Sequence, residues 1–122
     1  MIPTTLTANP AAALAHLCQR WASQDTANAA DVAAMRLAVA REFAAFRTQT
    51  PALRGWLFGS LVWGGFDKHS DIDIAVAGLS PADEVRLWTR LEIATGRAVD
   101  LLSLSTMPAP FAGRVTGSGI AL

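Results

Sequence analysis

The chain has 122 residues and carries 10 Lys and Arg against 10 Asp and Glu, so its formal net charge is zero. This length fits one domain, and the neutral balance argues against strong nucleic-acid binding, which needs a positive surface. The single cysteine, Cys18, excludes an intrachain disulfide and a cysteine-rich zinc site. No apolar run is long enough to span a bilayer and no secretory leader is recognisable, so we expect a folded cytoplasmic protein without a membrane segment.

The N-terminal part of the sequence predicts a pair of helices. A first helix is expected over about residues 10–23, because apolar residues recur there at helical spacing: Leu14, Leu17, Cys18 and Trp21. The polar residues 23–28 interrupt this pattern. A second helix is expected over about residues 29–48, where one apolar stripe contains Val32, Met35, Val39, Phe43 and Phe46. This helical pair, residues 1–50, either packs against a sheet or forms a surface for a partner.

After Thr50-Pro51 the spacing of apolar residues changes from helical to strand-like. The apolar run over residues 53–58 predicts a buried strand that ends at Gly59-Ser60. Residues 71–76 alternate Asp or Ala with aliphatic side chains, which is typical of a strand with one face in solvent and one in the core.

The C-terminal part predicts a further helix and two strands. Ser80-Pro81 followed by Asp83 predicts a capped helix over about residues 80–94, and Gly96 lies where its C-cap is expected. A strand follows over residues 98–104, with Asp100 on the same face as Leu102. A helical turn near residues 109–115 and a terminal strand at 119–122 complete an α/β or α+β domain, a small mixed sheet with flanking helices.

Asp71 and Asp73 are two residues apart on a predicted strand, so their side chains point to the same face with Cα atoms about 7 Å apart. Such a pair of carboxylates can hold one or two Mg²⁺ ions, because Mg²⁺ takes oxygen ligands. Without a metal, two buried like charges side by side would be costly. Alone, however, an Asp-x-Asp pair at the start of a strand more often faces solvent.

Gly59-Ser60 follows a predicted strand and precedes a predicted helical turn. Backbone N–H groups and a hydroxyl can bind a phosphate at such a turn, and a glycine lets the backbone approach it closely. An isolated Gly-Ser pair is more often an ordinary turn. The combination of Gly59-Ser60, ten residues and Asp71-Ile72-Asp73 is far more specific than either part.

From Trp56 to Val76 the chain resembles the nucleotidyltransferase superfamily, and within it the minimal nucleotidyltransferases, which are antitoxin partners of HEPN-domain toxins. The resemblance rests on the hydrophobic strand, Gly-Ser, ten residues and Asp-x-Asp, with a third carboxylate supplied by Val99-Asp100-Leu101. It covers about residues 53–122, the expected catalytic core. It implies a nucleotidyltransferase fold in a single domain, residues 1–122.

The resemblance also implies a role for each candidate residue. Gly59 and Ser60 would bind the β- and γ-phosphates of ATP. Asp71, Asp73 and Asp100 would hold Mg²⁺, with two ions expected, and Asp100 would help activate the attacking hydroxyl. The implied reaction transfers AMP to a tyrosine of a HEPN toxin. This chain contains no tyrosine, so the acceptor would lie on another chain, in a possible hetero-oligomer.

The sequence departs from the family pattern in the turn. Arginines often follow Gly-Ser in this family, whereas Leu61, Val62 and Trp63 stand here. Lys68 or His69 could supply the missing positive charge, and Trp63 could face the nucleotide or a partner. Two other functions stay open: a protein that neutralises a toxin by contact with weak catalysis, and a transferase for a small-molecule acceptor such as an aminoglycoside.

Overall fold

The computed structural model describes residues 10–122, with side chains described for residues 11–19 and 28–122. The helices are α2 (Pro10–Arg47), α3 (Ser60–Trp63), α4 (Pro81–Thr95) and α5 (Ala109–Ser118), with a short 3-10 helix η1 (Leu104–Thr106). The strands are β1 (Arg54–Phe58), β2 (Ile72–Ala77), β3 (Val99–Ser103) and β4 (Ile120–Ala121). By its contacts the chain divides into two units, residues 1–31 and 32–122, and the second unit contains all the strands.

The predicted pair of N-terminal helices is wrong, because α2 is one continuous helix of 38 residues. Residues 23–28 contain neither proline nor glycine, and polar residues in a helix cost only about 0.5 kcal/mol each relative to alanine, so the helix continues through them. Within residues 10–122, no helix combines the length and apolar character that crossing a membrane requires.

The first apolar stripe is exposed where its side chains are described, namely at Leu14, Leu17 and Cys18. The described part of the first unit, residues 10–31, consists of α2 alone and contains no second element that could cover these side chains. The side chain of Trp21 lies outside the described residues.

The strands form one mixed sheet in the order β3-β2-β1-β4. β1 pairs antiparallel with β2 and with β4, whereas β2 and β3 are parallel and are joined through α4. The caps of α4 are the predicted ones. Ser80 Oγ accepts a hydrogen bond from the backbone N–H of Asp83 at 3.2 Å, and Gly96 ends the helix with a φ of 66°. The expected α+β class with a small mixed sheet is confirmed.

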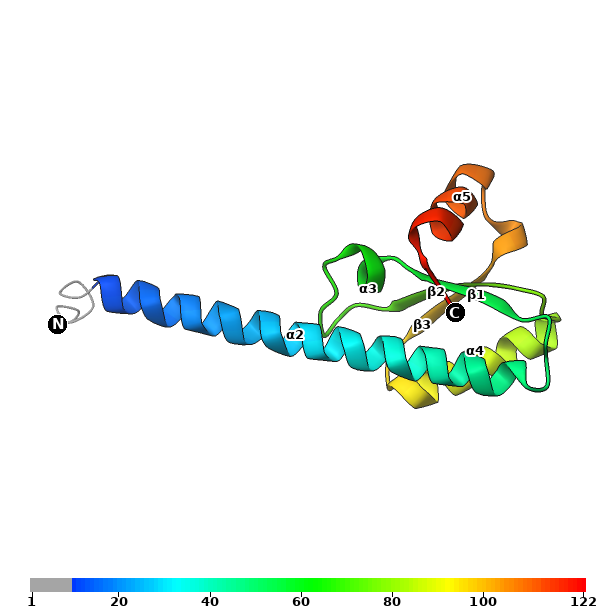
Figure 1. Cartoon of the computed structure of the whole chain (residues 1–122), viewed down its shortest axis with the longest axis horizontal. Coiled ribbons are helices and arrows are strands. Elements are labelled where there is room, and N and C mark those ends of the chain that lie inside the picture. Colours follow the sequence, from blue (N-terminus) through cyan, green and yellow to red (C-terminus); the bar gives the residue numbers. More distant parts are fainter. Residues whose placement is uncertain (1–9) are drawn as a thin grey trace. The chain divides into compact units, whose positions relative to one another are not determined.

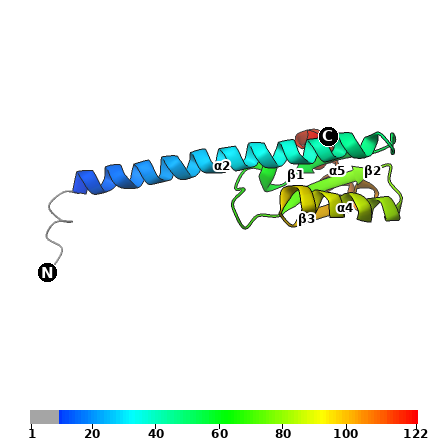
Figure 2. The ribbon, with the colours of Figure 1, turned by 90° about the horizontal axis from the view of Figure 1, so that it is seen from below.

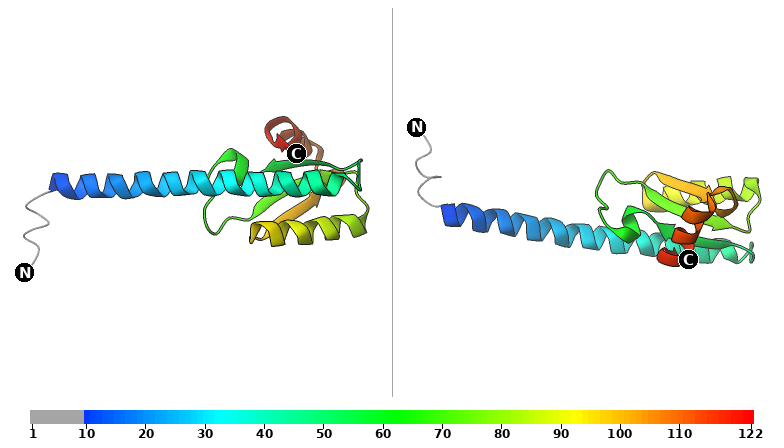
Figure 3. Two further views of the ribbon diagram at one scale, coloured as in Figure 1. Left: turned by 60° about the horizontal axis from the view of Figure 1, so that its bottom comes forward. Right: turned by 90° about the horizontal axis from the view of Figure 1, so that it is seen from above.

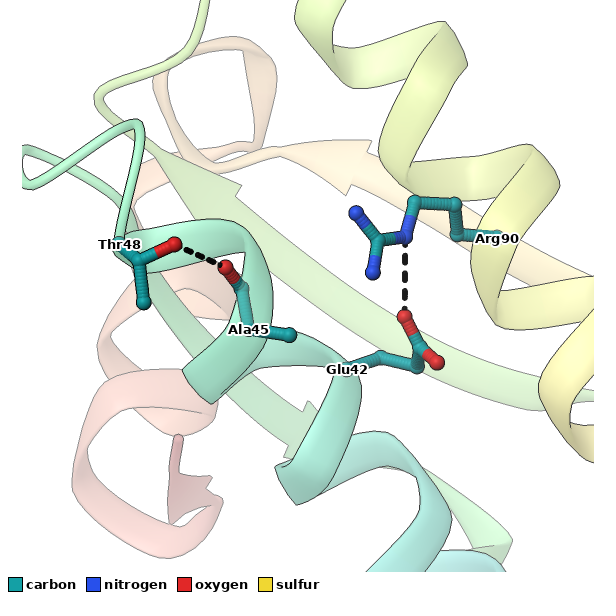
Figure 4. A network of polar contacts seen from close by, with 4 residues as sticks. All are labelled: Glu42, Ala45, Thr48 and Arg90. Carbon is teal, nitrogen blue, oxygen red and sulfur yellow. Dashed lines mark hydrogen bonds and ion pairs between the residues drawn. The ribbon is translucent and has the colours of Figure 1, made fainter.

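One face of the sheet carries the main core. Ile72, Ile74 and Val76 of β2 are fully buried there, as the alternation predicted. α4 and the part of α2 that lies in the second unit cover this face (Figures 1 and 2). An ion pair of 3.0 Å between Arg90 Nε and Glu42 Oε2 links these two helices (Figure 4).

The opposite face carries a smaller apolar cluster, in which Phe58, Ala75 and Val115 are buried. α5 lies on this side, away from α4 (Figure 3), and Trp63 of α3 packs against the same cluster, whereas Leu61 of α3 belongs to the main core. α5 is a full helix of 10 residues where a single turn was predicted, because Val115 and Phe111 pack onto the sheet and stabilise it. The remaining open part of this face carries the candidate site.

Candidate active site

Two of the three predicted carboxylates lie side by side. Asp73 of β2 is the register partner of Asp100 of β3, and paired strands are about 4.8 Å apart. The two carboxyl groups are close enough for the negative charge of Asp100 to raise the pKa of Asp73. Asp71 lies exposed, one residue before β2, on the same face as Asp73 by the alternation of the strand.

The surroundings of Asp73 disfavour the ionised form of its side chain. Its pKa is raised from 3.8 to about 6, mainly because burial disfavours its charge. The negative charges of Asp100 and Asp71 raise this pKa further. All of these causes penalise a negative charge that a bound cation would stabilise.

Gly59 brings the predicted phosphate turn directly against Asp73. Its backbone has φ 71° and ψ −152°, a region in which residues with a side chain are strained. A Cβ atom at Gly59 would lie 2.1 Å from Oδ2 of Asp73, so only glycine permits this close approach. Ser60 follows as the first residue of α3. The predicted phosphate-binding and metal-binding residues are therefore neighbours.

The described side chains contain no ready cluster of three His, Cys, Asp or Glu that could hold a metal ion. Strand register brings Asp73 and Asp100 together, and Asp71 is near enough for its negative charge to raise the pKa of Asp73. The chemistry of the pair nevertheless suits Mg²⁺, because both side chains offer carboxylate oxygens and repel each other when both are ionised. Asp73 and Asp100, with Asp71 as a further ligand, are the residues that could hold the metal.

Arg36 of α2 anchors the phosphate turn, a role that the sequence analysis missed. Its Nε and Nη2 donate to the backbone carbonyl of Leu61 at 3.0 and 2.7 Å, and Leu61 is the buried residue of α3. Arg36 directly follows Met35 of the apolar stripe and so lies beside the face that packs on the core. From the sequence, this position could indicate that Arg36 lies near the core, but it could not identify the Leu61 carbonyl as the group that Arg36 binds.

We expect Arg36→Ala to lower the free energy of unfolding by about 2 kcal/mol, because the Leu61 carbonyl loses both charge-assisted hydrogen bonds. Arg41→Ala is the matched control, since Arg41 is an exposed arginine of the same helix. It should change the stability by less than about 0.5 kcal/mol. Urea unfolding measures both values, and equal values would contradict the anchoring role.

Arg97 holds the loop that leads into Asp71. Its Nη2 donates to the backbone carbonyls of Asp67 and Ser70, the latter at 3.0 Å. Its guanidinium also lies 4.4 Å from the centre of the Phe66 ring. These contacts order the residues immediately before the candidate site.

The side chain of Trp63 contacts both β1 and α5. Its indole N–H donates to the carbonyl of Ser118 at 3.2 Å, and its ring centre lies 6.0 Å from that of Phe58. The guanidinium of Arg114 lies over the Trp63 ring, 4.1 Å from the ring centre. Trp63 therefore joins α3 to α5. Lys68 and His69, the expected sources of positive charge, are both exposed in the loop.

The glycine turn, the strand carboxylates and the mixed sheet together define a nucleotidyltransferase domain. The profile of the family described as Polymerase beta, Nucleotidyltransferase matches residues 44–122. The chain belongs to this family. The expected fold is therefore confirmed.

Solved structures extend the likeness. A crystal structure of a toxin–antitoxin with AMP-PNP is 28% identical, with 66% of this chain and 69% of that chain covered and a TM-score of 0.55. The toxin–antitoxin MntA-HepT is 27% identical, with coverages of 70% and 69% and a TM-score of 0.51. A structure described as a minimal nucleotidyltransferase is 26% identical, with coverages of 72% and 95% and a TM-score of 0.58. Among curated proteins none matches the chain. The resemblance to minimal nucleotidyltransferases is thus confirmed.

Proposed function

We propose that the chain is a Mg²⁺-dependent protein adenylyltransferase that transfers AMP from ATP to a tyrosine of a partner HEPN toxin and thereby acts as an antitoxin. The observation that carries the proposal is the register pairing of Asp73 with Asp100 on neighbouring strands, placed against the Gly59 turn. Membership of the family supports a nucleotidyltransferase. The similarity to toxin–antitoxin structures, one of them with AMP-PNP, supports ATP and a toxin as the partners.

In this proposal each part of the site has its own task. The backbone N–H groups and the hydroxyl of Gly59-Ser60 bind the β- and γ-phosphates. Asp71, Asp73 and Asp100 hold Mg²⁺. When bound, Mg²⁺, with two ions expected, neutralises the charge of the triphosphate and of the departing pyrophosphate.

Asp100 is the group we assign to the acceptor. It is exposed on β3 and can accept the proton of the attacking hydroxyl. The hydroxyl oxygen then forms a bond to the α-phosphorus, and the bond between that phosphorus and the pyrophosphate oxygen breaks. Since the chain has no tyrosine, the acceptor lies on another chain and a hetero-oligomer must form at least transiently. Because the reaction uses ATP, we propose the cytoplasm as its location.

The proposal is tested by incubating the protein with labelled ATP, Mg²⁺ and the protein encoded beside it. We expect label on the partner, at a tyrosine identified by mass spectrometry. The double variant Asp71→Ala with Asp73→Ala should transfer none. Absence of transfer by the natural protein, or transfer that survives the double variant, contradicts the proposal.

A second function is favoured by one observation, the absence of arginine from the three residues that follow Ser60. If the triphosphate is bound weakly, the chain would neutralise a toxin by contact alone. The same double variant separates the two functions. If it still binds the partner and neutralises it fully, contact is sufficient and catalysis is not the antitoxin activity.

A further inference from the structure

The proposed nucleotide site needs a cation beside the triphosphate. Leu61, Val62 and Trp63, which follow Ser60, offer none. Phosphate oxygens are best bound by charge-assisted hydrogen bonds, and the planar guanidinium of arginine donates two of them in parallel. The charge must therefore come from an arginine or lysine elsewhere in the described chain that lies near the turn.

Most of the described cations contact other groups. Three arginines donate to backbone carbonyls: Arg36, Arg47 and Arg97. Two more pair with carboxylates on the helices that cover the opposite face, namely Arg86 with Asp83 and Arg90 with Glu42. Arg54 lies 5.8 Å from the centre of the Trp56 ring, at the start of β1. Arg41 is exposed on α2, and Lys68 is exposed in the loop that precedes β2. Arg114 of α5 is the described cation that contacts a side chain of α3, the helix that begins at Ser60.

Arg114 is held at the turn through Trp63. The guanidinium lies 4.1 Å from the centre of the Trp63 ring, and it makes no hydrogen bond or ion pair within the described residues. Trp63 ends α3, which begins at Ser60. Residues three apart on a helix have Cβ atoms about 5–6 Å apart on the same side. The guanidinium is therefore stacked on the ring of Trp63, the residue one helical turn after Ser60, with its donors available.

The same contacts place Arg114 on the correct face of the sheet. The Trp63 ring is adjacent to the Phe58 ring, with centres 6.0 Å apart. Phe58 is the register partner of Asp73, so its side chain lies on the face that carries the candidate carboxylates. α5, which carries Arg114, packs on this face and not on the face covered by α4.

We propose that Arg114 is a triphosphate-binding residue, whose guanidinium donates to β- or γ-phosphate oxygens of a nucleotide bound at Gly59-Ser60. Stacking on Trp63 orients the guanidinium before the nucleotide arrives, so less side-chain freedom is lost on binding. The arginine thus replaces, from a distant helix, the charge that the turn itself lacks. This inference rests on the proposed function, because it requires a nucleotide at the turn.

The test is nucleotide binding by Arg114→Ala and by Arg114→Gln, which keeps an aliphatic stem over Trp63 without the charge. Calorimetry in the presence of Mg²⁺ should show ATP binding weakened by about tenfold, as expected for a lost charge-assisted contact to phosphate. AMP binding should be unchanged, because AMP lacks the β- and γ-phosphates. In the transfer assay the KM for ATP should rise by a similar factor with little change in kcat.

Arg41→Ala is the control, because it removes the same charge from an exposed position of α2. It should alter ATP affinity by less than about twofold. If both Arg114 variants bind ATP as tightly as Arg41→Ala does, Arg114 is not a triphosphate ligand although the proposed function stands. An equal loss of ATP and AMP affinity also overturns the inference. If the natural protein binds no ATP, the proposed function fails first.

Discussion

Asp73→Asn should abolish nucleotide transfer and, in the absence of metal, make the protein more stable above pH 6. Transfer is expected to fall by about a thousandfold, because the carboxylate proposed to bind the metal becomes a neutral amide. The stability gain has a separate cause. In the folded chain the pKa of Asp73 is raised from 3.8 to about 6, so the folded state binds this proton more tightly than the unfolded state.

The sign of the pH dependence follows from this difference. Below pH 3.8 the carboxyl is protonated in both states and its ionisation costs nothing. The cost grows as the pH rises from 3.8 to about 6 and stays constant above. The raised pKa sets an upper limit of about 3 kcal/mol, and we expect about 1 kcal/mol because Asp73 is partly open to solvent. Asparagine removes this cost because its side chain is neutral at every pH.

Thermal unfolding at two pH values tests the expectation. At pH 7.5 without metal, Asp73→Asn should raise the Tm by about 5 °C, and at pH 4 it should leave the Tm nearly unchanged. Glu84→Gln removes a carboxylate in the first turn of α4 and should not stabilise. A Tm for Asp73→Asn that is unchanged or lower at pH 7.5 would show that Asp73 carries no unfavourable charge in the folded chain.

Gly59→Ala is the second substitution with a large expected effect. Alanine is strained at φ 71° and ψ −152°, and its Cβ would lie 2.1 Å from Oδ2 of Asp73. We expect the free energy of unfolding to fall by about 3 kcal/mol. Transfer should be lost as well, because the new methyl group displaces either the turn or the Asp73 carboxylate.

Gly64→Ala separates backbone strain from the contact with Asp73. Gly64 has a φ of 110°, and no atom lies within 4 Å of a Cβ built there. This control should cost about 1–2 kcal/mol for the backbone alone and retain transfer. Urea unfolding and the transfer assay give both quantities. If the two glycine variants lose equal stability and equal activity, the close approach of Gly59 to Asp73 does not matter.

Features encoded within a few residues could be predicted from the sequence. The alternation from Asp71 to Val76 predicted β2 and its buried face, and Ser80 and Gly96 predicted both ends of α4. The wrong break in α2 arose because residues 23–28 lose apolar periodicity, which reports the loss of a buried face and not the end of a helix. The length of α5 could not be predicted either, because it depends on the packing of Phe111 and Val115 onto the sheet.

The supporting arginines of the site could not be predicted. Arg36, Arg97 and Arg114 each contact a residue far away in the sequence, namely Leu61, Ser70 and Trp63. A charged residue on a predicted helix or loop is most often solvated. Its actual partner depends on which elements pack together, which a local pattern does not specify. The acidic residues were easier to predict, because Asp71, Asp73 and Asp100 belong to the motifs that carry the family resemblance; the structure then places Asp73 opposite Asp100.

β3 is the outermost strand of the sheet on the side away from β1, and Asp100 and Leu102 are both exposed on it. In the proposed function, β2 and the Gly59-Ser60 turn bind ATP, whereas the acceptor hydroxyl reaches Asp100 at the edge of the sheet. Substitutions at Leu102 and its exposed neighbours on β3 would therefore change which acceptor is recognised without changing how ATP is bound. Relatives with this small fold would then differ in their acceptors through the edge strand, while the residues that bind ATP stay the same.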